Sequence, residues 1–149
     1  MEKKVLATGV FDLIHPGHIL FLEKAKKIGG KNSKLIVVIA RDSTVLKFKG
    51  VKPIFNEKIR KRIVSSLKPV DVTILGFKKF SIEKIIKKIK PDIIVFGYDQ
   101  IKIMKEFERI CKEKNWNIKI VRLKKFRSGQ INSSSQIVKK IIKLRGHKF

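Results

Sequence analysis

The feature of this sequence that most constrains its fold is a repeated alternation of short apolar runs with longer amphipathic stretches. The apolar runs suit buried strands and lie at Val5–Gly9, Leu35–Ala40, Val70–Leu75, Asp92–Phe96 and Ile118–Val121. Between them, apolar residues recur three and four positions apart, as they do on one face of a helix. Strands that alternate with helices in this way predict parallel pairing with right-handed crossovers.

Caps and apolar stripes mark the helices expected between these runs. One helix is expected from about Gly17 to Ile28, and others start after Asn56 and Ser81, whose side chains can cap a helix. A final helix is expected from about Ser133 to Lys143. The residues expected to face inward on this final helix are Ile137, Val138, Ile141 and Ile142.

The sequence therefore predicts a single α/β domain over residues 1–149, with a Rossmann-like open parallel sheet of about five strands and helices on both faces. A chain of this length suits one hydrophobic core. Sheets of this kind bind ligands beyond the carboxyl ends of their strands, where the strand order reverses. Chemistry is expected after Gly9, between Ala40 and Lys49, after Phe96 and after Val121.

The most distinctive segment follows the first expected strand and reads Thr8-Gly-Val-Phe-Asp-Leu-Ile-His-Pro-Gly-His. It places His15 and His18 at the expected start of a helix, where unpaired backbone amides attract phosphate. Gly17 lets that backbone approach a ligand closely. Histidines at this point can donate hydrogen bonds to phosphoryl oxygens as charge develops in an in-line displacement. The segment thus favours phosphate chemistry.

This segment has two other interpretations. The histidines can serve only to cap the helix and fill a turn, but the strand, the Thr-Gly and Phe-Asp pairs and the helix start are all in register, which favours function. A metal site is the weaker alternative, because no third histidine or second cysteine stands nearby.

The segment Gly9-Val-Phe-Asp-Leu-Ile-His-Pro-Gly-His resembles the signature of the HxGH cytidylyltransferase and adenylyltransferase superfamily. Within it, the chain is most similar to the small archaeal FAD synthase (FMN adenylyltransferase) group, and next to the bacterial glycerol-3-phosphate cytidylyltransferases. The segments that resemble the FAD synthase group are Ala40-Arg-Asp-Ser-Thr-Val, Lys49-Gly-Val-Lys-Pro-Ile, Leu67-Lys-Pro-Val-Asp and Gly97-Tyr-Asp-Gln. The resemblance implies transfer of AMP from ATP to FMN, with release of pyrophosphate after direct in-line attack on the α-phosphate.

The resemblance also implies roles for individual residues. His15, His18 and Lys47 are expected to be catalytic, with Lys49 as the second match to the phosphate-binding lysine. Nucleotide contacts are expected from Thr8, Gly9, Val10, Phe11, His15, Gly17, His18, Asp99, Arg127, Ser133, Ser134 and Ser135. Phosphate or acceptor contacts are expected from Asp12, Arg41, Asp42, Lys49 and Arg60.

Some of these assignments have structural alternatives. The lysines can be two more surface lysines, and the loop from Gly97 can simply cap the next helix. The serines can be an ordinary helix cap, although their hydroxyls and the helix-start amides also suit a triphosphate tail. Asn132 stands where relatives often carry isoleucine, and the spacing back to Arg127 is one residue longer than in the cytidylyltransferases.

The acceptor is indicated by an apolar segment after the lysine pair. Phe48, Val51, Pro53, Ile54 and Phe55 can form a wall for the isoalloxazine ring of FMN, although they also suit a lid or ordinary core. The loop from Gly97 lacks the acidic pair and tryptophan associated with the cytidylyltransferases. Both features favour FMN and ATP over the alternative, CTP and glycerol 3-phosphate. No metal cage is expected; a divalent ion such as Mg²⁺ would arrive with the triphosphate.

The formal charge of +25, from 37 Lys and Arg against 12 Asp and Glu, attracts polyanions. A basic nucleic-acid-binding module is therefore a function of another class to consider. The lysines are spread along the chain and no nucleic-acid motif is present, so only non-specific binding of nucleic acid is expected.

No apolar run approaches the roughly 20 residues of a membrane span, so no membrane association is expected. The single cysteine, Cys111, suits a reducing compartment, which predicts a cytoplasmic protein. Relatives of the resembled family suggest a homodimer.

Overall fold

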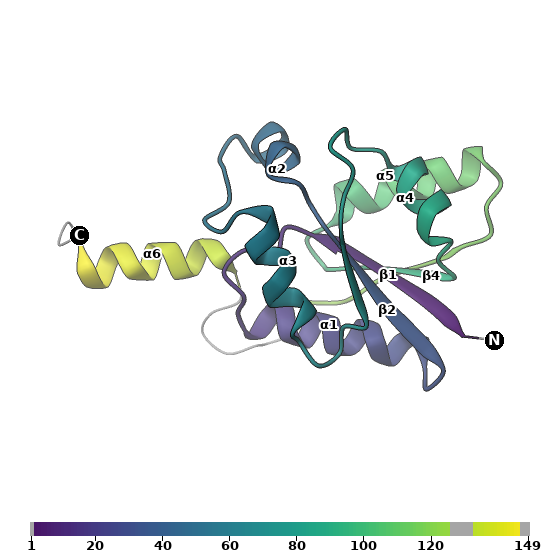
Figure 1. The fold of residues 1–149 in the computed structure, drawn as a ribbon, viewed down its shortest axis with the longest axis horizontal. Coiled ribbons are helices and arrows are strands. Elements are labelled where there is room, and N and C mark those ends of the chain that lie inside the picture. The colour runs from purple at the N-terminus through teal and green to yellow at the C-terminus, as the bar shows by residue number, and fades with distance from the viewer. Residues whose placement is uncertain (1, 126–132, 147–149) are drawn as a thin grey trace.

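The computed structural model describes residues 2–125 and 133–146 and places a parallel sheet at the centre of the molecule (Figure 1). The sheet contains β1 (Lys3–Gly9), β2 (Ser33–Ile39), β3 (Val72–Leu75), β4 (Ile93–Phe96) and β5 (Lys119–Arg122). Their order is β3-β2-β1-β4-β5, and all four neighbouring pairs are parallel. The predicted open sheet of five parallel strands is confirmed.

Helices cover both faces of this sheet, as predicted. Along β1, Val5 and Ala7 face one core and Leu6 faces the other, because side chains alternate along a strand. The first core includes α1 (Pro16–Gly29) and α3 (Glu57–Ser65), and the second includes α4 (Ile82–Ile89) and α5 (Ile101–Glu113). The four isoleucines of α4 are all buried.

The predicted caps of two helices are also confirmed. The Asn56 side chain accepts a hydrogen bond from the amide of Ile59 at 3.0 Å, which caps α3. The Ser81 hydroxyl accepts one from the amide of Lys84 at 3.2 Å, which caps α4.

A short helix that the sequence analysis did not assign, α2 (Asp42–Lys49), follows β2. Val45 is its only buried residue, so the segment carries no periodic apolar stripe to indicate a helix. The helix ends at Gly50, which has a φ of 75°, a left-handed conformation that favours glycine. It therefore presents Lys47, Phe48 and Lys49 at the carboxyl edge of the sheet, largely exposed.

The prediction that the last helix, α6 (Ser134–Arg145), buries an apolar stripe is wrong. None of its residues is buried, and Ile141 and Ile142 are 48% and 61% exposed. Figure 1 shows α6 projecting away from the sheet. The stripe of Ile137, Val138, Ile141 and Ile142 indicates an apolar face, but other helices already cover both faces of the sheet.

Among the described residues, no helix, α6 included, is long and apolar enough to cross a membrane.

The strand order reverses between β1 and β4, which are neighbours although they are far apart in the sequence. From β1 the chain moves outward to β2 and β3, and from β4 it moves outward to β5. The carboxyl ends of β1 and β4, at Gly9 and Phe96, therefore flank the crevice in which such sheets bind ligands.

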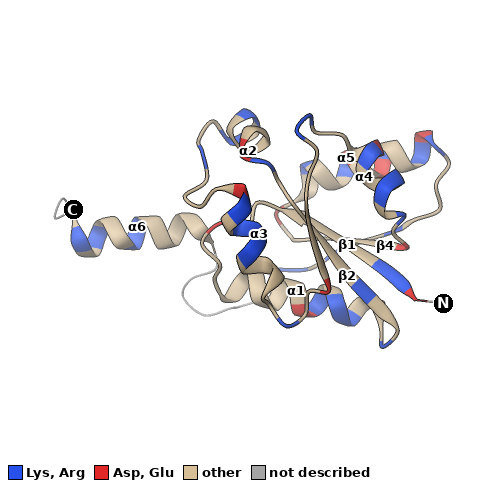
Figure 2. Ribbon diagram, viewed as in Figure 1, with Lys and Arg blue, Asp and Glu red and all other residues tan. Residues whose placement is uncertain are grey.

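Positive charge is widely distributed over the molecule. Figure 2 shows Lys and Arg on helices of both faces of the sheet and on α6. No single helix or face of the described chain collects them, so the excess charge does not by itself mark a binding surface.

Candidate active site

The site begins with a tightly turned loop between β1 and α1. Phe11 and Leu13 have positive φ angles of 54° and 45°, which are uncommon for residues other than glycine and store strain. The turn directs the Phe11 ring into the core, where it is only 6% exposed. A Cβ on Gly9 would lie 2.8 Å from that ring, so the loop requires glycine at this position.

Both histidines of the loop cap α1 through their Nδ1 atoms. Nδ1 of His15 accepts a hydrogen bond from the amide of Gly17 at 3.0 Å, and Nδ1 of His18 accepts one from the amide of His15 at 3.2 Å. The pair forms a reciprocal capping box, with Pro16 at the first helical position.

This capping determines which ring nitrogen carries the proton. A nitrogen that accepts from a backbone amide is unprotonated, so each neutral imidazole carries its hydrogen on Nε2. The two rings lie side by side with centroids 3.8 Å apart. Among the described residues, neither Nε2 atom has a hydrogen-bond partner. The two histidines thus act as caps and also offer two N–H donors to a ligand.

The surroundings keep these rings neutral. Burial, the neighbouring His15 and the charge of Lys49 together lower the pKa of His18 to about 4, while Asp12 opposes them. Burial also lowers the pKa of His15. Both rings are therefore neutral hydrogen-bond donors near pH 7.

The loop after β4 lies against the end of β1. The Gln100 side chain donates a hydrogen bond from Nε2 to the carbonyl of Thr8 at 2.9 Å and accepts one from the amide of Gly97 at 2.8 Å. These bonds hold the loop on the β4 side of the crevice, with Tyr98 and Asp99 exposed.

The start of α6 reaches the same loop as the histidines. The Ser133 hydroxyl accepts a hydrogen bond from the amide of Gln136 at 3.2 Å and caps the helix. The Ser134 hydroxyl donates to the carbonyl of Asp12. The amino ends of α1 and α6 thus both meet the β1–α1 loop, while Ser135 is exposed. Arg127 lies outside the described residues.

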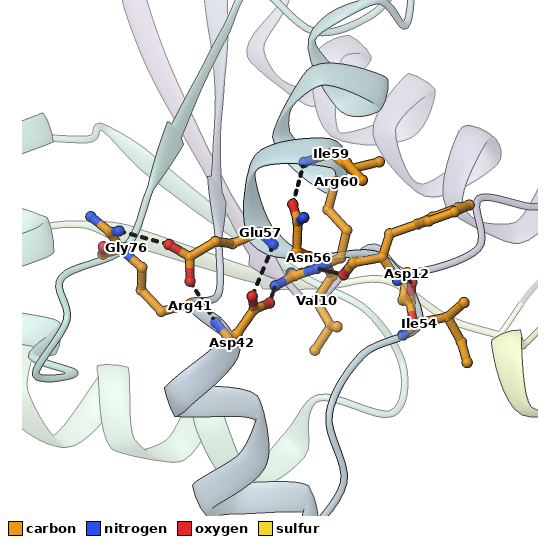
Figure 3. A network of polar contacts seen from close by, with 11 residues as sticks. Val10, Asp12, Arg41, Asp42, Ile54, Asn56, Glu57, Ile59, Arg60 and Gly76 are labelled. Carbon is orange, nitrogen blue, oxygen red and sulfur yellow. Dashed lines mark hydrogen bonds and ion pairs between the residues drawn. The ribbon is translucent and has the colours of Figure 1, made fainter.

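A buried arginine joins this loop to the neighbouring elements (Figure 3). Arg60 is fully buried, and its guanidinium donates to the carbonyl of Val10 at 2.7 Å, to the carbonyl of Phe55 at 2.9 Å and to a carboxylate oxygen of Asp42 at 2.6 Å. Asp12 adds a second link, because its carboxylate accepts from the amides of Ile54 and Phe55 at 2.6 and 3.0 Å.

Two acidic residues cap each other's helices in the same region. The amide of Asp42 donates to the Glu57 carboxylate at 2.9 Å, and the amide of Glu57 donates to the Asp42 carboxylate at 3.2 Å. Arg41 pairs with Glu57 at 2.7 Å and donates to the carbonyl of Gly76 at 2.6 Å. We call Asp12, Arg41, Asp42, Glu57 and Arg60 the polar network.

Four of the five residues expected to contact phosphate or acceptor, Asp12, Arg41, Asp42 and Arg60, thus make hydrogen bonds within the framework, and of these only Arg60 is fully buried. Arg60 cannot reach a ligand in this arrangement because its polar atoms are buried and bonded to protein. Thr8 and Phe11, expected at the nucleotide, are also buried, and the Phe11 ring lies beside that of His18 with centroids 5.6 Å apart. The expected residues that the structure does bring together at the crevice are His15, His18, Ser133 and Ser134.

The structure also distinguishes the two lysines. The charge of Lys49 acts on His18, whereas the Lys47 ammonium lies 5.8 Å from the ring centroid of Phe48. The sequence motifs favour Lys47 over Lys49 and assign no role to Gln100 or Glu57. The signal for Glu57 was its place directly after the Asn56 cap, where an acid suits a helix start. Gln100 carried no such signal.

Within residues 2–125 and 133–146, no group of three or more His, Cys, Asp or Glu side chains could hold a metal ion.

Replacing Arg60 by Met should lower the free energy of unfolding by about 3–5 kcal/mol, because it leaves a carboxylate and two carbonyls without their donor. Arg62→Met, two residues along the same helix at an exposed position, should change it by less than about 0.5 kcal/mol. Urea denaturation followed by circular dichroism measures both. Equal losses in the two variants would mean that the buried arginine does not hold the loops.

The folded-state pKa of His18, about 4, lies below its ordinary value of 6.5. The unfolded chain therefore takes up a proton first as the pH falls, and His18 should reduce stability progressively between those two values. Between about pH 7 and about pH 5, the free energy of unfolding should fall less in His18→Gln than in the wild type; urea denaturation at both pH values measures the difference. An imidazole NMR titration in which His18 protonates near its ordinary pKa would contradict this expectation.

Comparison with known proteins matches residues 6–140 to the family described as Cytidylyltransferase-like. Among similar proteins, the FAD synthase of Aciduliprofundum boonei is 49% identical, covering 93% of this chain and 90% of the relative. The FAD synthase of Methanothermus fervidus is 49% identical over 94% of this chain and 95% of its own. That of Methanopyrus kandleri is 48% identical over 97% and 95%.

Solved structures agree. The lipopolysaccharide core biosynthesis protein of Thermoplasma volcanium is 39% identical with a TM-score of 0.71, over 85% of this chain and all of the other. A protein of unknown function from Archaeoglobus fulgidus is 17% identical with a TM-score of 0.61, over 86% of this chain and 98% of its own, and shares the fold. With the family match spanning most of the sequence and three relatives near half identity, this chain belongs to the cytidylyltransferase-like family of nucleotidyltransferases.

Proposed function

We propose that this protein is an FAD synthase, an adenylyltransferase that makes FAD and pyrophosphate from FMN and ATP. The similarity to FAD synthases at 48–49% identity over more than nine-tenths of the chain carries the choice of substrates. The paired imidazole donors at the start of α1, beside the point where the strand order reverses, support the reaction type.

The reaction is a direct transfer. A phosphate oxygen of FMN attacks the α-phosphorus of ATP and forms the new P–O bond, while the bond to the β-phosphate bridging oxygen breaks and pyrophosphate leaves with the electron pair. Charge accumulates on the non-bridging oxygens of the α-phosphate. His15 and His18, as neutral Nε2–H donors, would stabilise that charge without needing to change protonation state.

The triphosphate tail would lie between α6 and α2. The amides and hydroxyls of Ser133 and Ser135 at the positive end of α6 suit the β- and γ-phosphates. Lys49 is the better candidate for the phosphate-binding lysine, because its charge acts at His18. A divalent ion such as Mg²⁺ would bind phosphate oxygens and neutralise part of their charge.

Several assignments stay predictions. Asp99, on the exposed loop after β4, is expected at the nucleotide, as are Gly9, Val10, Gly17 and Arg127. A cytoplasmic location and a homodimer are expected for the reasons given from the sequence. The spread of lysines over the molecule favours weak, salt-sensitive binding of nucleic acid over sequence recognition.

Incubation with FMN, ATP and Mg²⁺ should yield FAD, identified by chromatography, and His18→Ala should reduce the rate about a hundredfold to a thousandfold because a charge-stabilising donor is lost. A parallel incubation with CTP and glycerol 3-phosphate tests the alternative acceptor. CDP-glycerol as product, with no FAD at any metal tried, would exclude the proposed function.

Lys49→Ala should raise the Michaelis constant for ATP more than Lys47→Ala does, since the charge of Lys49 acts at His18. A lysine that binds phosphate acts as a point charge, so the difference between the two variants should shrink at high salt. Initial rates at varied ATP and salt concentrations measure both effects. A larger effect of Lys47→Ala would return the role to that lysine.

A further inference from the structure

Two phenylalanine side chains meet at the surface where β2 and β3 end. Phe48 on α2 and Phe80 on the β3–α4 loop are 64% and 37% exposed, and their ring centroids lie 5.7 Å apart at an angle of 81°. Such a corner presents the face of one ring beside the edge of the other, and a flat aromatic ligand can pack against both.

The polar network connects the two segments that carry these rings. Arg41, directly before α2, donates to the carbonyl of Gly76 at the start of the loop that carries Phe80. Asp42 and Glu57 cap the helices on either side of the connection that follows Phe48. The segments that carry the aromatic corner are therefore joined to the framework of the site, in which Figure 3 shows Arg41 beside Gly76, although the rings themselves are exposed.

The corner also lies on the β2–β3 side of the sheet, opposite the loop that is expected at the nucleotide. The chain reaches α2 and Phe80 from β2 and β3, whereas the Gly97–Gln100 loop expected at the nucleotide follows β4 on the other side of β1. Lys49 follows Phe48 directly and acts at His18, so one short helix combines an exposed ring with a cation near the histidines. A ligand with a flat aromatic ring and a terminal phosphate matches that combination.

The geometry points to Phe48 and Phe80 as the subsite for the isoalloxazine ring of FMN, with the FMN phosphate directed past Lys49 toward the histidines. This inference rests on the proposed function and adds the two residues that select a flavin over a small acceptor. A small polar acceptor such as glycerol 3-phosphate gains nothing from an aromatic corner, whereas a flavin ring removes both phenylalanines from water.

Initial rates at varied FMN and at varied ATP test the subsite. Phe48→Ala and Phe80→Ala should each raise the Michaelis constant for FMN about tenfold, leaving that for ATP within about twofold. Phe48→Tyr, which keeps the ring, should restore the wild-type value. Ile142→Ala, at a comparably exposed apolar position on α6, is the matched control and should leave both constants unchanged.

Two results would overturn the subsite while FAD synthesis stands. One is an unchanged Michaelis constant for FMN in both alanine variants, and the other is a rise for ATP instead, which would assign the corner to adenine. Binding of FMN alone, measured by the anisotropy of its fluorescence, distinguishes failure of the proposed subsite from failure of the proposed function. If the wild type makes no FAD yet binds FMN, weaker binding by Phe48→Ala supports the subsite; equal binding, or none by the wild type, overturns it.

Discussion

The arrangement of the site depends on one buried cation. The guanidinium of Arg60 has no contact with water and divides its hydrogen bonds among three segments: the loop after β1, the connection before α3 and the first turn of α2. A charge removed from water requires partners on every side, so these segments are held at fixed separations. The histidines follow the first of these segments and Lys49 ends the helix that begins with the third, so this interaction helps to set their relative positions.

Each imidazole also has two roles, one for each of its ring nitrogens. The Nδ1 atoms of His15 and His18 satisfy amides that the start of α1 would otherwise leave unpaired, and this fixes the protons on the opposite nitrogens. Helix capping and phosphate chemistry are therefore not competing explanations of the motif. The cap supplies the ring orientation and the tautomer that the chemistry needs.

The sheet and the histidine loop could be predicted because their signals are local. Buried strands give continuous apolar runs. A helix such as α4, with a capping serine and isoleucines three and four positions apart, can be predicted together with its buried face. The position of α6 could not be predicted, because an apolar stripe on a helix does not indicate which surface, if any, it packs against. Arg60 was assigned to phosphate because its burial comes from contacts 18 and 50 residues away, which no local pattern encodes. The contact of Phe48 with Phe80 is equally remote in sequence.

The mutual capping of Asp42 and Glu57 has a consequence for how this sequence can diverge. Each carboxylate satisfies the other's helix and also neutralises an arginine, Arg60 in one case and Arg41 in the other. A single replacement leaves a donor or a charge without its counterpart, so a variant with one change is less stable than one in which the partner changes too. Across related sequences, the residues at positions 41, 42, 57 and 60 should therefore change together. Replacing α2 by the corresponding helix of a relative would require the relative's residues at all four positions.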